Sequence, residues 1–225
     1  MNATATAPAY TRRAAEGSPY ALLNGAERYL HETRDDALLA LLRRHGIERL
    51  DGLRILELGC GEGALLRSLL HYGAQGPLIE AVDIDPARVA QAKASLPDAT
   101  LAVASVAALP YRSESFDLAF AFTIFSSVID GRTRRDAASE AMRVLRPRGL
   151  LVVYDFQVNP INRRVRPLPA RELRALFAPR TVEIERVTLA PPIVRVLGGR
   201  VSLCRPLERI SALRTHLLAA VVKED

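Results

Sequence analysis

The chain has 225 residues, of which 49% are hydrophobic and 25% charged, a balance typical of a globular protein with one sizeable core. It contains no apolar run of roughly eighteen residues, so no transmembrane helix is expected, and its start does not resemble a secretory signal. Two cysteines and four scattered histidines argue against a disulfide framework and against a bound metal. We therefore expect a cytoplasmic protein with no metal site and no membrane partner.

Residues 1–17 are expected to form a flexible arm, and residues 18–225 a single domain. Apolar residues recur near helical spacing between Ala21 and His45, which predicts one or two amphipathic helices and a helical lid over residues 18–46. Residues 157–212 are expected to form an insertion on the substrate side of the domain.

Short apolar runs alternate with helical stretches from Arg54 onward. We expect strands over residues 54–58, 77–83, 100–104, 117–122, 150–156, 182–189 and 215–222, and helices over residues 62–72, 86–95, 133–145 and 170–177. Continuously apolar strands that alternate with helices predict an α/β fold, with a doubly wound, mostly parallel sheet covered by helices on both faces.

A glycine-rich loop follows the first predicted strand. Gly59, Gly61 and Gly63 alternate there, and glycine permits positive φ and close approach of a ligand to the backbone. The spacing also satisfies the loose dinucleotide-binding pattern, and Asp83 lies where that pattern expects an acid for a ribose diol. Cys60, between two glycines, is interpreted as a small filler rather than a nucleophile.

Glu57 distinguishes a loop that binds a dinucleotide from a loop that binds a different ligand. A carboxylate directly before the loop would repel a pyrophosphate but suits a ligand that carries an ammonium group and a sulfonium. The segment resembles the first motif of class I S-adenosylmethionine (SAM)-dependent methyltransferases, a (V/I)-L-(D/E)-x-G-x-G-x-G strand and loop. Three more segments resemble that family in order: Ala-Val-Asp-Ile-Asp-Pro at 81–86, Leu109-Pro110 with Ser-Phe-Asp-Leu-Ala at 115–119, and Leu-Arg-Pro-Arg-Gly-Leu-Leu at 145–151.

This resemblance implies a seven-stranded sheet whose last strand is antiparallel to the rest, and SAM as the cofactor with S-adenosylhomocysteine as the product. The implied cofactor-binding residues are Glu57, Gly59, Cys60, Gly61, Gly63, Asp83, Ile84, Ser105, Val106 and Phe122. Ser105 departs from the family, which often has an acid there for the adenine amino group, so adenine binding would rely on the Val106 N–H and on apolar contacts. Arg148 replaces a glycine in the turn into the fifth strand, a surface change expected to be harmless.

Four residues are candidates for a catalytic base: Asp155, His216, His31 and Tyr20. Each has a structural alternative, since Asp155 could cap a loop and His216 could be a satisfied core histidine. Phe122 could be part of a pocket wall or plain core. His31 on the lid is interpreted as exposed.

The favoured function is transfer of a methyl group from SAM to a small-molecule acceptor, an oxygen of a sugar, glycan precursor or secondary metabolite. RNA methylation and non-catalytic SAM binding in a regulatory protein are the alternatives. The net charge is +6, and residues 157–215 hold twelve arginines against four glutamates. This charge fits either an anionic partner or the arginine-rich composition of a GC-rich bacterial genome.

Few aromatic residues lie among these arginines, which argues against nucleic acid and favours a small, anionic acceptor. Arg163, Arg164 and Arg166 are the expected clamp for it. The protein is expected to be a monomer or a homodimer.

Overall fold

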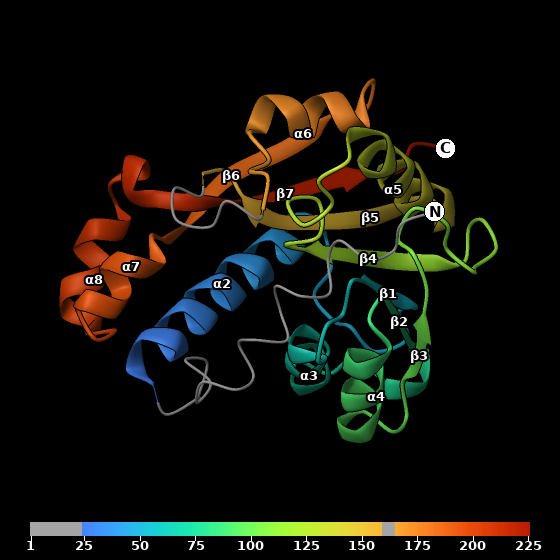
Figure 1. Cartoon of the computed structure of the whole chain (residues 1–225), viewed down its shortest axis with the longest axis horizontal. Coiled ribbons are helices and arrows are strands. Elements are labelled where there is room, and N and C mark those ends of the chain that lie inside the picture. The colour runs from blue at the N-terminus through green and yellow to red at the C-terminus, as the bar shows by residue number, and fades with distance from the viewer. Residues whose placement is uncertain (1–23, 159–164) are drawn as a thin grey trace.

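The computed structural model describes residues 24–158 and 165–225 (Figure 1). In chain order the elements are α2 (Gly25–Arg44), β1 (Ile55–Leu58), α3 (Ala64–His71), β2 (Ile79–Asp83), α4 (Pro86–Ser95), β3 (Thr100–Val103), β4 (Phe116–Phe122), α5 (Gly131–Val144), β5 (Leu145–Phe156), α6 (Ala170–Phe177), β6 (Val182–Leu189), α7 (Pro191–Val196), α8 (Val201–Glu208) and β7 (Arg214–Val222).

The strands form one seven-stranded sheet in the order β3-β2-β1-β4-β5-β7-β6. β1 to β5 pair in parallel, whereas β7 is antiparallel to both β5 and β6. This confirms the predicted seven-stranded, mostly parallel sheet with an antiparallel last strand. The strand order reverses between β1 and β4, and ligands of such sheets bind outside the carboxyl ends of the strands at that point.

Helices cover both faces of the sheet (Figure 1). Buried side chains of α2, α3 and α4 pack on one face, and those of α5 and α6 pack on the other. The central strands are buried on both sides, which explains their continuous apolar runs.

Within residues 24–46, the described part of the predicted lid, the structure has one helix, α2, whose two halves have different surroundings. Leu38, Leu41 and Leu42 pack into the core of the sheet. The amino-terminal half instead packs Ala26 and Tyr29 against α7 and α8. α2 is therefore part of the layered core at one end and reaches beyond the sheet at the other.

Two predicted helix starts are displaced by capping. α3 begins at Ala64 because Gly63 takes a left-handed φ of 79° as its N-cap. α5 begins at Gly131 because the Asp130 carboxylate accepts a 2.7 Å hydrogen bond from the Thr133 N–H and caps the helix two residues earlier than predicted.

Arg148 has a left-handed backbone, with φ 65°, in the turn where the family has glycine. A side chain in this region costs about 1–2 kcal/mol. Replacing Arg148 with glycine is therefore expected to raise the free energy of unfolding by about 1 kcal/mol in urea denaturation. Arg148→Ala removes the same charge but keeps the unfavourable φ, so it should give no gain; equal stabilisation by both variants would contradict the conformational explanation.

Candidate cofactor and acceptor site

The glycine loop is tied to the end of β2. The N–H groups of Gly59 and Cys60 both donate to the Val82 carbonyl, at 2.8 and 2.9 Å. Gly59 has a φ of 74°, and a Cβ there would collide with the Ile124 side chain, so the loop passes directly under the residues that follow β4. Burial raises the pKa of the Cys60 thiol to about 12, which keeps it protonated and suits a filler role.

Asp83 organises the loop with its carboxylate. One oxygen accepts a 2.8 Å hydrogen bond from the Gly61 N–H, and the other accepts one of 2.9 Å from the Asp85 N–H. Asp85 has a different task, since its side chain accepts from the Ala87 N–H and caps α4. The two acids therefore separate into a loop-binding residue and a helix cap.

Glu57 is only 3% exposed at the end of β1. Burial raises the pKa of its carboxyl well above the usual range, while the positive charge of Arg34 opposes this shift. Its Oε2 is buried and has no hydrogen-bond partner within residues 24–158 and 165–225. This carboxyl oxygen therefore has unused hydrogen-bonding capacity toward a donor group of a ligand.

Arg34 of α2 lies in the same region, and no motif indicated it. Its guanidinium carbon lies 5.8 Å from the centre of the Phe122 ring, and its Nε donates to Asp35 at 2.8 Å. Its buried Nη2 forms an ion pair with Asp35 but has no hydrogen-bond acceptor in the described part of the chain. The sequence feature that could have identified Arg34 as a site residue is its position on the apolar stripe of α2, four residues from both Leu30 and Leu38.

Aromatic rings continue from Phe122 across the carboxyl end of the sheet. The Phe122 and Tyr154 rings lie 5.2 Å apart, and Tyr154 stacks on His216 at 4.8 Å with an interplanar angle of 8°. The His216 ring also lies against the Phe156 ring, with 4.3 Å between the ring centres. The Tyr154 hydroxyl is 2.9 Å from the Thr188 Oγ1, which fixes the central ring of this aromatic row.

Two of the described catalytic candidates, His216 and Asp155, lie on opposite faces of the sheet. His216 pairs with Phe156 and Asp155 pairs with Leu217, and successive residues of a strand point to opposite faces. Burial, with the positive charge of Arg34, lowers the pKa of His216 to about 3, so its imidazole is neutral at pH 7. His216 shares a face with Tyr154, whereas Asp155 cannot assist it.

Asp155 is fully buried and binds backbone groups. Its Oδ2 accepts a 2.9 Å hydrogen bond from the Ser126 N–H, and its Oδ1 accepts one of 2.8 Å from the Phe156 N–H. Burial raises the pKa of Asp155 to about 6. These contacts are those of the loop-capping alternative, with the carboxylate holding the segment after β4.

The adenine side follows β2 and β3. Ile84 is 49% exposed, which leaves an apolar surface beside Asp83. Ser105 accepts a 3.2 Å hydrogen bond from the Ala107 N–H and closes a turn in which the Val106 N–H takes no part. The use of the Val106 N–H for adenine in place of the absent acid stays a prediction.

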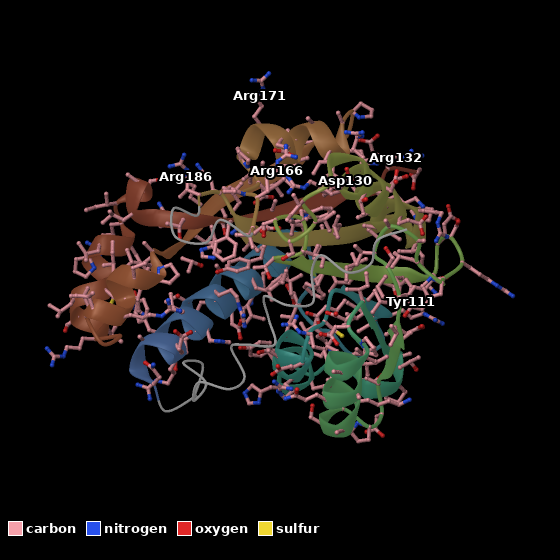
Figure 2. The ribbon with its side chains drawn as sticks, viewed as in Figure 1. Tyr111, Asp130, Arg132, Arg166, Arg171 and Arg186 are labelled. Carbon is pink, nitrogen blue, oxygen red and sulfur yellow. The ribbon has the colours of Figure 1, made fainter. Side chains whose placement is uncertain are left out.

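Outside the described residues lie three residues predicted for the site: Tyr20, Arg163 and Arg164. Arg166 is described, and it forms an ion pair with Glu172 at 3.1 Å, which neutralises part of its charge (Figure 2). The structure thus brings together Glu57, the glycine loop, Asp83 and Phe122 at the ends of β1, β2 and β4.

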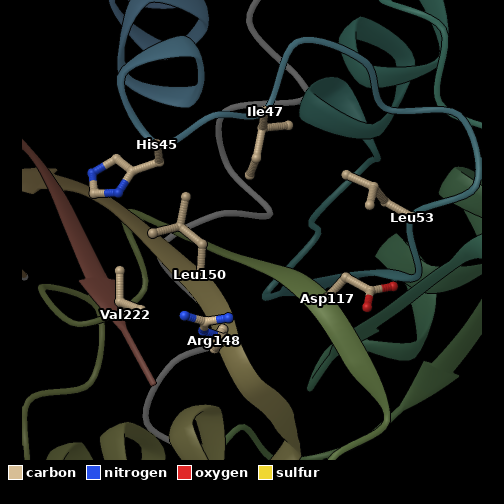
Figure 3. Close-up of a pocket in the computed structure, with 7 residues that line it drawn as sticks. All are labelled: His45, Ile47, Leu53, Asp117, Arg148, Leu150 and Val222. Carbon is tan, nitrogen blue, oxygen red and sulfur yellow. The ribbon is translucent and has the colours of Figure 1, made fainter. Parts of the chain in front are cut away.

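A separate hollow lies at the opposite end of the central strands, where the parallel strands begin (Figure 3). Its lining residues precede β1, lie near the start of β4 or in the first half of β5, or end β7: His45, Ile47, Leu53, Asp117, Arg148, Leu150 and Val222. It is therefore distant from the glycine loop. Among residues 24–158 and 165–225, no cluster of three metal-ligating side chains and no helix long and apolar enough to cross a membrane is present.

Comparison with known proteins agrees with this geometry. Residues 56–153 match a family model described as a methyltransferase domain, which spans β1 to β5. Among curated proteins, none matches the sequence significantly.

Solved structures share the fold at low identity. A SAM-dependent methyltransferase from Mesorhizobium loti is 22% identical, with a TM-score of 0.59, over 83% of this chain and 97% of that one. Phosphoethanolamine N-methyltransferase 2 from Haemonchus contortus, solved with SAM, is 17% identical, with a TM-score of 0.61, over 84% of this chain and 53% of that one. The [4+2]-cyclase SpnF is 20% identical, with a TM-score of 0.59, over 84% of this chain and 81% of that one. Residues 56–153 thus match a methyltransferase-domain family model, and the seven-stranded sheet has the fold of these solved SAM-dependent methyltransferases.

Proposed function

We propose that this chain binds SAM at the carboxyl ends of β1, β2 and β4 and transfers its methyl group to a small-molecule acceptor, an oxygen of a sugar, glycan precursor or secondary metabolite. One observation carries the cofactor assignment. Beside the glycine loop, the buried Glu57 Oε2 has no hydrogen-bond partner in the described chain, and the buried Arg34 Nη2 forms an ion pair with Asp35 but no hydrogen bond of good geometry. The ammonium and carboxylate groups of an amino acid would satisfy both at once.

The adenosine part would lie toward β2 and β3. The Asp83 carboxylate, 7% exposed, retains acceptor capacity for ribose hydroxyls beyond the two N–H groups that it holds. Ile84 would contact the adenine ring, and the Val106 N–H would donate to it. Glu57, Asp83 and Val106 would therefore bind the two ends and the middle of one extended ligand.

When bound, SAM supplies a methyl group on a sulfonium sulfur, which is already activated toward a nucleophile. The protein then has to align the acceptor and exclude water. The aromatic row of Phe122, Tyr154 and His216 supplies apolar walls on the face of Glu57. We assign His216 the role of a neutral hydrogen-bond acceptor and Asp155 that of a positioning residue for the loop after β4.

We further propose a small anionic acceptor rather than RNA. The exposed arginines around α6, Arg171 and Arg174, are not interleaved with exposed aromatic residues that could stack on bases. Arg166 already binds Glu172, so the clamp would depend more on Arg163 and Arg164. If turnover persists on neutral acceptors after Arg163, Arg164 and Arg166 are changed to alanine, these arginines do not act as a clamp for the acceptor.

Isothermal titration calorimetry tests the cofactor assignment with a matched pair of variants. Asp83→Asn is expected to weaken binding of S-adenosylhomocysteine by about 1.5–3 kcal/mol, because a hydrogen bond to a charged group is lost. Asp85→Asn should leave binding unchanged, since asparagine caps a helix as well as aspartate does. Tight NAD binding, or equal losses in both variants, would contradict the proposed site.

Methyl transfer needs its own measurement, because a cyclase also has this fold. Incubation with methyl-labelled SAM and fractionated small metabolites should give a labelled product of low mass. Label that appears only in RNA would favour the RNA alternative, and cofactor binding without any labelled product would favour the regulatory one.

A further inference from the structure

α7 and α8 form a hairpin that extends from one end of the sheet (Figure 1). It is held to the rest of the molecule by a small cluster of its own, in which Val194 and Cys204 pack against Ala26 and Tyr29 of α2. The inward side of the hairpin thus packs within the chain, and exposed side chains of the hairpin are left uncovered by the residues that the structure describes.

The outward side carries exposed aliphatic side chains. Val196 is 87% exposed, and Val201, Leu203 and Ile210 are 49%, 44% and 50% exposed. Gly198 and Gly199 form the turn that brings the end of α7 next to the start of α8. The hairpin thus exposes four large aliphatic residues within fifteen positions, and a cluster of exposed apolar side chains is a mark of an interaction site.

Arginines are placed between these aliphatic residues. Arg200, Arg205 and Arg209 are exposed, and Arg195 is half-exposed although it pairs with Glu27. Glu208 is the one acid in residues 190–214, and it lies against Tyr29, whose pKa it helps to raise. The hairpin therefore exposes both aliphatic and basic side chains.

We propose that this hairpin docks on an anionic lipid surface. Aliphatic side chains can enter the interfacial region of a bilayer while neighbouring arginines bind lipid phosphates. Residues 190–214 contain no Tyr, Phe or Trp, which are the residues that stack on nucleic-acid bases and that dominate protein–protein hot spots. This inference does not rest on the methyl-transfer proposal, and it departs from the sequence-based expectation of no membrane partner.

Vesicle co-sedimentation of the full chain tests the docking surface. The protein should pellet with vesicles of phosphatidylcholine and phosphatidylglycerol, but not with phosphatidylcholine alone. High salt should reduce the bound fraction. Changing Arg200, Arg205 and Arg209 together to glutamine should weaken the affinity at least about tenfold, and Val196→Ser with Leu203→Ser should weaken it as well.

Matched controls lie elsewhere on the surface. Arg171→Gln with Arg174→Gln removes exposed charge from α6, where Figure 2 shows Arg171 pointing away from the molecule, and Ile129→Ser removes an aliphatic residue that is 58% exposed. Both controls should bind vesicles like the wild type. Equal binding to the neutral vesicles, or equal losses in the control and hairpin variants, would overturn the proposal. The proposal would also be overturned if the wild-type protein binds no vesicles but forms a concentration-dependent dimer that the hairpin variants abolish.

Discussion

Arg134→Met is expected to lower the free energy of unfolding by about 3 kcal/mol. Arg134 is fully buried in α5, and its guanidinium binds three separate segments. Nε donates to the Val128 carbonyl at 3.0 Å, Nη1 to Glu172 at 2.7 Å and Nη2 to the Arg166 carbonyl at 3.3 Å. Methionine fills much of the volume but leaves the carbonyls without a donor, so urea denaturation should report the loss.

The neighbouring residue provides the control. Arg135→Met changes the same residue type on the same helix, but Arg135 is exposed, so its effect should stay within about 0.5 kcal/mol. Glu172→Gln keeps an acceptor for Arg134 and should cost less than Arg134→Met. If Arg134→Met and Arg135→Met have equal stabilities, the buried network does not hold these segments.

The location of this network also predicts a local effect. Val128 follows β4 and Arg166 follows β5, and these are the segments beside the site at the carboxyl ends of the strands. Hydrogen exchange of Arg134→Met should therefore increase in residues 123–130 more than in β1 or β2. An increase spread evenly over the sheet would indicate global destabilisation instead.

The sheet could be predicted from the sequence because its signals are local. Continuous apolar runs mark β4 and β5, and Pro86 after Asp85 marks the start of α4 at the observed residue. The glycine loop and Asp83 were found because each lies next to the end of a strand, so their proximity follows from the parallel topology.

The partners of these residues could not be predicted in the same way. Arg34 is 23 positions from Glu57 in the sequence, and its approach depends on how α2 packs across the sheet. The pairing of His216 with Phe156 depends on the β5–β7 register, and one step of register would have moved it to the face of Asp155. Arg134 had no motif either, because its contacts come from three segments that meet only in the folded chain.

Glu57→Gln is expected to weaken binding of S-adenosylhomocysteine by about 1.5–3 kcal/mol and, in the absence of ligand, to stabilise the fold at neutral pH. The binding loss follows because a neutral amide replaces the carboxylate that would accept from the ligand's ammonium group. The stabilisation follows because the buried carboxyl, with its unpartnered Oε2, is costly to ionise. Opposite signs for binding and stability are typical of a group kept for function.

The pH dependence has a defined sign. The raised pKa of Glu57 means that the folded chain holds a proton at a pH where the unfolded chain has released it. The stability contributed by this group is therefore present at low pH and is lost as the pH rises through the folded-state pKa. The gain from Glu57→Gln over wild type should accordingly grow with pH in urea denaturation, and a gain that shrinks with pH would contradict a buried, unpaired carboxyl.

A truncated ligand tests where Glu57 acts. 5′-Methylthioadenosine keeps the adenosine part and the sulfur but has no amino acid group. It should therefore bind wild type, Glu57→Gln and Arg34→Gln with similar affinity, while S-adenosylhomocysteine distinguishes the three. Asp83→Asn should weaken both ligands, because the Asp83 carboxylate holds the loop through Gly61 and faces the ribose in the proposed site. Calorimetry in buffers of different ionisation enthalpy should also detect proton release from Glu57 when S-adenosylhomocysteine binds, and none when 5′-methylthioadenosine binds. If Glu57→Gln weakens both ligands equally, its carboxyl maintains the loop rather than binding the ammonium group, and the cofactor orientation proposed for this site is wrong.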